Sequence, residues 1–102
     1  MFSFRKRYKV EYVESGRSGN IIYRESGNSV SFYWEFGGAD NVILIISLPD
    51  AATWDKNFPW ANGRRMEICK RVAEAAAKDK CSNCYAEYDE KHGDYLVISR
   101  SR

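Results

Sequence analysis

Apolar and polar residues alternate along most of the first half of the chain. Tyr8, Val10 and Tyr12 alternate with charged residues, which is the period of a strand buried on one face. After a turn-like SGRSGN segment (15–20), the alternation continues through NIIYRES (20–26) and SVSFYWEF (29–36). NVILIISL (41–48) is apolar at almost every position, which predicts a central strand covered on both faces, or covered where it meets a helix. The first half of the chain therefore predicts four strands.

The pair Gly27-Asn28 separates the second and third of these runs and is a two-residue hairpin signal. A turn at this pair places Tyr23 opposite Phe32 and Ile21 opposite Trp34. A slip of one residue would exchange the two faces, so the alternation itself decides which side chains share a face. One face is strongly apolar, with Ile21, Tyr23, Val30, Phe32, Trp34 and Phe36. The other face is mixed, with Ile22, Arg24, Ser31, Tyr33 and Glu35.

Helical spacing of apolar residues begins at about Asn62 and continues to Lys80. Two further alternating runs follow, at Tyr85–Asp89 and Tyr95–Ser99. The order β-β-β-β-α-β-β predicts a single α+β domain over residues 1–102, an antiparallel sheet with one amphipathic helix packed on one face. Because one helix cannot cover both faces of six strands, we expect one face to be partly open to water or to a partner. The buried stripe of the helix is expected to contain Ile68, Cys69, Val72, Ala73 and Ala76.

The composition narrows the classes of function and location. The net charge of the 102 residues is +2, so no global field favours nucleic acid or a membrane surface. The longest apolar run, Val42–Leu48, is too short to span a bilayer. Basic residues near the N-terminus are not followed by an apolar segment, which argues against a secretory signal. With three cysteines and no export signal, we expect a cytoplasmic chain with reduced thiols.

Cys69, Cys81, Cys84 and His92 have the composition of a three-cysteine, one-histidine zinc set. Their spacing argues against such a site, because the 12 residues from Cys69 to Cys81 span about 18 Å along a helix. We expect no metal and no cofactor. Cys69 is interpreted as a core residue, and the C-x-x-C pair as part of the turn from helix to strand.

The sequence contains no recognisable catalytic set. His92, the only histidine, falls in the EKHGD segment that is expected to form a hairpin tip. No G-x-S-x-G motif and no glycine loop for phosphate occur. We therefore expect no enzymatic activity. The alternative of a small-ligand-binding or enzymatic domain, with a pocket between the aromatic loop Thr53–Arg65 and the sheet, remains open.

A nucleic-acid-binding module is a second alternative. Tyr23 and Tyr33 lie on predicted sheet faces where bases could stack. Against this reading, the 14 acidic residues offset the terminal basic residues, and no RNP-type motif is present. Nucleic acid is therefore the less favoured partner. The basic residues at the two termini are Arg5, Lys6, Arg7, Lys9, Arg100 and Arg102.

The connection TWDKNFPWANGRR (53–65) is unusually aromatic for a segment between a strand and a helix. Either Pro59 is the first helical residue, or Asn62 caps a helix that begins at Gly63. In the second case Arg64 and Arg65 occupy the first turn, where the helix dipole disfavours cations by roughly 0.3–1 kcal/mol each. Asp55 or an acidic group of a partner could compensate them. The aromatic rings can fill the core or, together with the arginines, form an exposed anchor.

The segment SVSFYWEFGGADNVILIISLPDAATWDKNFPWANGRRMEICKRVAEAAA, about half the chain, resembles the small single-domain immunity proteins of bacterial toxin–immunity systems. The resemblance lies in a compact meander, an aromatic loop, an amphipathic helix and the lack of a catalytic set. It implies a protein that binds and neutralises a cognate toxin domain. Inhibitors of nucleases in such systems are often acidic, whereas this chain is slightly basic. A nuclease partner would therefore need a local acidic patch such as Glu87, Asp89, Glu90 and Asp94.

These observations favour a non-catalytic protein-binding domain, and the resemblance implies an immunity-type inhibitor. An exposed strand edge near Tyr8–Tyr12 or Tyr95–Ser99 could also pair with a second copy, so the chain is expected to be a monomer or an edge-strand homodimer. Two surfaces are candidates for the partner. The first is the uncovered sheet face, with Ile22, Arg24, Tyr33 and Glu35, and the second is the loop edge, with Trp54, Asp55, Trp60, Arg64 and Arg65.

Overall fold

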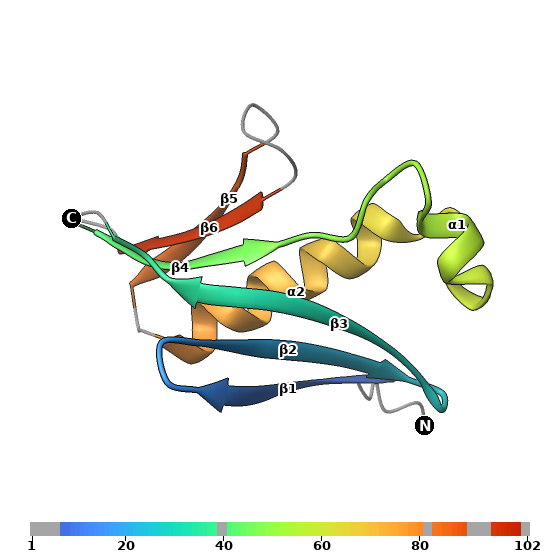
Figure 1. The fold of residues 1–102 in the computed structure, drawn as a ribbon, viewed down its shortest axis with the longest axis horizontal. Coiled ribbons are helices and arrows are strands. Elements are labelled where there is room, and N and C mark those ends of the chain that lie inside the picture. Colours follow the sequence, from blue (N-terminus) through green and yellow to red (C-terminus); the bar gives the residue numbers. More distant parts are fainter. Residues whose placement is uncertain (1–6, 39–40, 81–82, 90–94, 101–102) are drawn as a thin grey trace, which may run out of the picture.

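The computed structural model describes residues 7–38, 41–80, 83–89 and 95–100, which form an antiparallel sheet and one long helix (Figure 1). This confirms the predicted α+β fold and the predicted order of elements. The strands are β1 (Tyr8–Ser15), β2 (Ser18–Glu25), β3 (Asn28–Phe36), β4 (Val42–Ser47), β5 (Cys84–Asp89) and β6 (Tyr95–Arg100). The helices are α1 (Trp54–Asn57), the 3-10 helix η1 (Pro59–Ala61) and α2 (Arg65–Lys80).

The six strands lie in the order β1-β2-β3-β4-β6-β5, and every neighbouring pair is antiparallel. The edges are therefore β1 and β5. The prediction of an edge at Tyr95–Ser99 is wrong, because β6 lies between β4 and β5. The reason is visible in the side chains of β6: Leu96 and Ile98 are buried and Val97 is half-buried. A strand that is apolar on both faces is suited to the interior of a sheet.

The β2–β3 hairpin turns at Ser26-Gly27 and not at Gly27-Asn28. Both turn residues have positive φ, 51° and 81°, as a type I′ hairpin turn requires. Tyr23 consequently pairs with Val30, two residues from the predicted partner Phe32. A shift of two residues keeps each side chain on its face, so the predicted assignment of residues to the two faces remains correct.

The core lies between α2 and one face of the sheet, which we call the covered face. All five residues of the predicted helical stripe are buried, and Ala77 joins them. Trp34 is fully buried and lies over Gly19, where an added Cβ would come within 3.0 Å of the indole. Phe36, predicted on this face, is exposed, and its ring centre lies 5.3 Å from that of Trp34. No helix of the described residues is long and apolar enough to cross a membrane.

The aromatic connection fills one end of the core. The Trp54 side chain is 1% exposed, and its Nε1 donates a hydrogen bond to the Ala61 carbonyl at 2.9 Å. The Phe58 ring packs 4.6 Å from the Trp54 ring. Pro59 begins η1, and α2 begins at Arg65, three residues after the predicted start. Gly63 has φ +73°, which breaks the helical path between η1 and α2.

Candidate functional site

The sheet face opposite α2 carries no helix among the described residues, and we call it the open face (Figure 1). Its members follow from the alternation along each strand and from the cross-strand pairs. Ile22, Arg24, Tyr33 and Glu35, which were predicted to form an uncovered face, all lie on it. The remaining members include Lys9, Glu11, Val13, Asn20, Ser29, Ser31, Ile45, Ser47, Tyr85, Glu87, Asp89, Tyr95 and Val97.

The β3-β4-β6-β5 half of the open face has an apolar centre. Ile45 pairs with Val97, and both side chains are half-buried. The Tyr33 and Tyr85 side chains flank this pair and are 48% and 42% exposed. Tyr95, paired with Ser47, extends the same surface. We define the apolar centre as Tyr33, Ile45, Tyr85, Tyr95 and Val97.

Acidic side chains border the apolar centre. Glu35 pairs with Ile45 and Glu87 pairs with Val97, so the two carboxylates stand at opposite ends of one cross-strand row. Both are exposed, and neither forms an ion pair with any residue that the structure describes. Asp89 of β5 pairs with Tyr95 of β6 and lies on the same face. We define the acidic rim as Glu35, Glu87 and Asp89. An apolar centre with a charged rim is the general composition of a protein–protein interface.

The β1–β2 half of the open face is different. Arg24 Nε lies 3.0 Å from a Glu11 carboxylate oxygen, and the two side chains are 50% and 45% exposed. Because this pair neutralises itself, the half carries less charge available to a partner. Of the four predicted sheet-face residues, Tyr33 and Glu35 therefore belong to the apolar centre and acidic rim. Arg24 is part of the neutralised pair, and Ile22, which pairs with Glu11 across the strands, lies beside it.

The predicted loop edge is not a single surface. Trp54 lies in the core, which removes it from any surface that a partner could reach. Asp55 accepts a hydrogen bond from the Gly63 N–H at 2.8 Å and so closes the loop, and Trp60 is half-buried. Arg65 Nε donates to the Pro49 carbonyl at 2.9 Å. The aromatic and basic residues of this segment are thus largely engaged in holding the fold.

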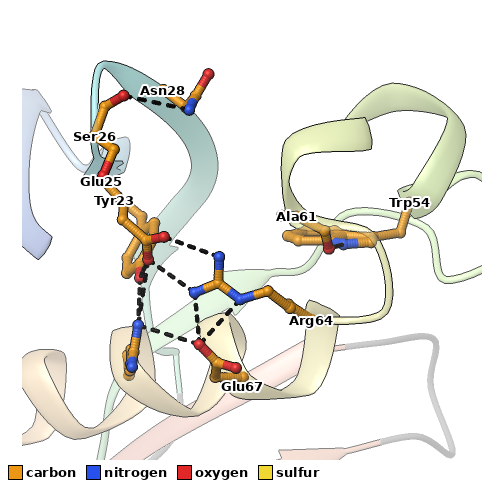
Figure 2. Close-up of polar contacts among 9 residues, drawn as sticks. Tyr23, Glu25, Ser26, Asn28, Trp54, Ala61, Arg64 and Glu67 are labelled. Atoms are coloured by element: carbon orange, nitrogen blue, oxygen red, sulfur yellow. Dashed lines mark hydrogen bonds and ion pairs between the residues drawn. The ribbon is translucent and has the colours of Figure 1, made fainter. Parts of the chain in front are cut away.

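Arg64 is engaged in the same way, by the carboxylates of Glu25 from β2 and of Glu67 from the first turn of α2 (Figure 2). Its two terminal nitrogens donate to Glu25 at 2.8 and 2.9 Å, and Glu67 accepts from its Nε and Nη2 at 3.1 and 2.6 Å. The hydrogen bonds from Arg64 lower the pKa of Glu25 from 4.5 to about 2, against the opposing effect of burial. The same residue lowers the pKa of Glu67. Glu25 and Glu67, rather than Asp55 or a partner, are therefore the acids that compensate Arg64.

Arg71 extends this network to β1. Its Nη1 donates to the Tyr23 hydroxyl at 2.8 Å and contacts Glu25 at 3.3 Å. Its guanidinium carbon lies 4.7 Å from the centre of the Tyr8 ring, which stacks on Tyr23 at 5.4 Å. Burial, with the hydrogen bond to Glu25, raises the pKa of Tyr23, and the bond to Tyr23 raises the pKa of Arg71. The displaced pKa values arise from burial of Tyr23 and from the hydrogen bonds and ion pairs that join α2 to the covered face, and they keep these groups in the same charge state near neutral pH.

The described part of the chain shows no group of side chains for a metal ion, and one of its cysteines is in a disulfide. No three His, Cys, Asp or Glu side chains there are placed to hold a metal ion. Of the zinc set considered above, Cys81 and His92 lie outside the described residues. Cys69 is buried in the core, as expected. Cys84 is disulfide-bonded, so the prediction of reduced thiols at this turn is wrong for Cys84.

The geometry gives little support to the two alternative functions, which are nucleic-acid binding and a pocket beneath the Thr53–Arg65 loop. Tyr23 is fully buried and offers no surface to a base. Among the described basic residues, Arg7 precedes β1 and Arg100 ends β6, and the cross-strand pairs place them at opposite ends of the sheet. Arg5, Lys6 and Arg102 lie outside the described residues. A cavity of about 590 Å³ that described residues line lies between α2 and β5, away from the Thr53–Arg65 loop.

The alternation of the sequence did not single out four members of the apolar centre, Ile45, Tyr85, Tyr95 and Val97. The signal in the sequence that could have identified them is the apolar character of both faces of β4 and β6, which leaves Ile45 and Val97 on the side away from α2.

Comparisons with protein families, with curated proteins and with solved structures found no match to this chain.

Proposed function

We propose that this protein is a non-catalytic binding domain that recognises another protein through the apolar centre of the open face. The observation that supports this most directly is the exposure of Tyr33 and Tyr85 on a sheet face that no described helix covers. Large aromatic side chains held by strands lose little conformational entropy on binding, and tyrosine is enriched at interface hot spots. A flat apolar surface with a polar border suits a protein surface better than a small ligand.

The acidic rim favours a partner that is basic around its own contact surface. Glu35 and Glu87 would be brought close to the partner on both sides of the Ile45–Val97 pair. Opposite charges across a rim raise the association rate and reject partners of like charge. An immunity-type inhibitor of a toxin domain with a basic active surface would meet this condition. The same carboxylates disfavour a nucleic acid on this face, because they would face its phosphates.

The first test is capture of partners from the native host with two matched variants of the purified chain. The open-face variant replaces Tyr33 and Tyr85 by Ser, and the control replaces Phe36, an exposed aromatic residue outside the open face, by Ser. We expect the open-face variant to bind the partner at least tenfold more weakly. It lacks two anchor side chains, each of which should contribute about 1 kcal/mol or more to the free energy of binding. The control should retain the partner. Equal capture by wild type and both variants would contradict the proposal.

The second test addresses the immunity role. The captured partner is identified by mass spectrometry and expressed alone and together with this chain. We expect growth arrest when it is expressed alone and recovery on co-expression with the wild type but not with the open-face variant. A partner that is harmless by itself would leave protein binding in place and exclude the immunity role.

A further inference from the structure

A cavity of about 310 Å³ lies at the end of the sheet where the β2–β3 turn meets the start of β1 (Figure 1). Tyr8 pairs with Glu25, the last residue of β2, so the start of β1 lies beside the turn. Residues 7–9 line the cavity from one side and residues 24–28 from the other. None of these residues belongs to the apolar centre or the acidic rim, so the cavity is distinct from the surface assigned to a protein partner.

The charged side chains among the described lining residues are mostly basic. They are Arg7, Lys9, Arg24 and Glu25. Glu25, the single acid of this set, is 15% exposed, and its carboxylate already accepts two hydrogen bonds from Arg64. Arg24 is balanced by Glu11, whose carboxylate oxygen lies 3.0 Å from its Nε. The remaining charge at the cavity is therefore positive.

Arg7 and Lys9 are the two cations that this balance leaves available. Both are exposed, and neither forms an ion pair or a side-chain hydrogen bond with a described residue. Lys9 also lies directly opposite Arg24 in the β1–β2 pair. Like charges at directly opposite positions destabilise an antiparallel pair, and Glu11 offsets only one of these two. An anion bound in the cavity would offset the other.

The β2–β3 turn adds neutral hydrogen-bond donors to the same cavity. The backbone N–H groups of Ser26 and Gly27 and the Ser26 hydroxyl donate to no described residue. The cavity thus combines a guanidinium group, an ammonium group and uncharged donors. This combination suits the several oxygens of a phosphate group, which accept charge-assisted hydrogen bonds from arginine and lysine.

We propose that this cavity binds the phosphate group of a small phosphorylated molecule, with Arg7 and Lys9 on the phosphate oxygens and the Ser26-Gly27 turn as a further donor. A volume of about 310 Å³ is at the lower end of the range for small-molecule sites. A nucleic acid would need basic side chains for successive phosphates. On the open face beyond the cavity, a nucleic acid would instead meet the carboxylates of Glu11 and Glu35.

The test uses the full chain, labelled with ¹⁵N and titrated with inorganic phosphate, with ribose 5-phosphate and with ribose at constant ionic strength. We expect saturable changes in the amide resonances of residues 7–9 and 24–28 with the two phosphates and no change with ribose. Potassium chloride at the same ionic strength is the control for screening. Changes that do not saturate, that chloride reproduces, or that lie outside these segments would overturn the proposal.

Matched variants test the two cations. Arg7→Gln and Lys9→Gln should each weaken the binding of ribose 5-phosphate about threefold to fivefold, as loss of a single exposed charge contact would. The double variant should bind at least ninefold more weakly. The control is Lys56→Gln in α1, since Lys56 is exposed, does not line the cavity, and changes the net charge by the same amount. An equal loss in the control would mean that net charge alone is responsible and would contradict the site.

Two further comparisons separate this proposal from its neighbours. The open-face variant, with Tyr33 and Tyr85 replaced by Ser, should bind ribose 5-phosphate like the wild type, because neither tyrosine lines the cavity. Loss of phosphate binding in that variant would show that the cavity is part of the open face. A thymidine decamer without terminal phosphates that displaces ribose 5-phosphate at a lower concentration would assign the cavity to a nucleic acid, and the proposal of a small molecule would be wrong.

Discussion

The covered face and the open face of the sheet arise from the same alternating strands but have different environments. On the covered face, Ile21, Phe32 and Leu44 are fully buried under α2. On the open face, Tyr33 and Tyr85 remain more than two-fifths exposed at comparable positions. The difference shows that apolar character alone does not decide burial. The position of the single long helix decides which apolar side chains become core and which remain available to a partner.

The same contrast holds for ion pairs. Glu25 on the covered face is 15% exposed and is bound by both terminal nitrogens of Arg64. Glu11 on the open face is 45% exposed and makes a single contact with Arg24. Water screens the second pair far more than the first, so we expect the covered-face pair to stabilise the fold and the open-face pair to contribute little. Four substitutions, ordered by expected effect, test this contrast between the faces.

The largest effect is expected from Trp54→Ala, in the aromatic connection that fills one end of the core. Removing a fully buried indole and its hydrogen bond to Ala61 should lower the free energy of unfolding by about 3–5 kcal/mol. Urea unfolding followed by circular dichroism measures it, with Trp60→Ala, a half-buried ring in the same segment, as the control. A loss for Trp54→Ala below that of the control would contradict the assignment of Trp54 to the core.

Glu25→Gln tests the ion pairs on the covered face. The folded-state pKa of Glu25, about 2, lies below its ordinary value of 4.5, so its contribution is present above pH 4.5 and is lost as the pH falls toward 2. At neutral pH we expect a loss of about 2 kcal/mol, allowing for partial exposure. Unfolding free energies of both proteins, measured from neutral to acidic pH, should converge below pH 4.5. A constant difference across that range would show that Glu25 does not titrate in this way.

Tyr33→Ser tests the open face. Because the ring is half exposed on a face that no described helix covers, the free energy of unfolding should fall by less than about 1 kcal/mol, well below the loss for a core aromatic. Partner capture should nevertheless be weakened. Thermal unfolding combined with the capture experiment separates the two effects. A loss of several kcal/mol would mean that Tyr33 is part of the core and that the open face is covered.

The smallest effect is expected from Arg24→Gln. This change removes an exposed ion pair, so the free energy of unfolding should change by less than about 0.5 kcal/mol, and less still at high salt. Glu11→Gln is the matched control and should behave alike. A loss similar to that of Glu25→Gln would abolish the distinction between the two faces.

The cytoplasmic location stays a prediction, and the disulfide at Cys84 is a feature more common in oxidising compartments. The homodimer through an edge strand also stays a prediction, with β1 and β5 now the strands that could form it.

Much of the fold could be predicted because its signals are local. The alternation assigned Ile21, Tyr23 and Val30 to one face, and helical spacing identified Ile68 and Val72 as buried. The candidate site was only partly predictable. Tyr33 and Glu35 were found from alternation within one hairpin, whereas Val97 and Tyr85 join them only because β6 and β5 continue the sheet beyond β4.

The sequence by itself therefore determined which side chains share a face of a strand or a helix, because periodicity is a property of neighbouring residues. The tertiary structure alone decided the hairpin register, through the positive φ of Ser26 and Gly27, and the edge position of β5. It also decided that Arg64 is paired with Glu25, 39 residues away along the chain. Such pairings depend on contacts between distant segments, whose free energies cannot be read from the spacing of residues within any one of them.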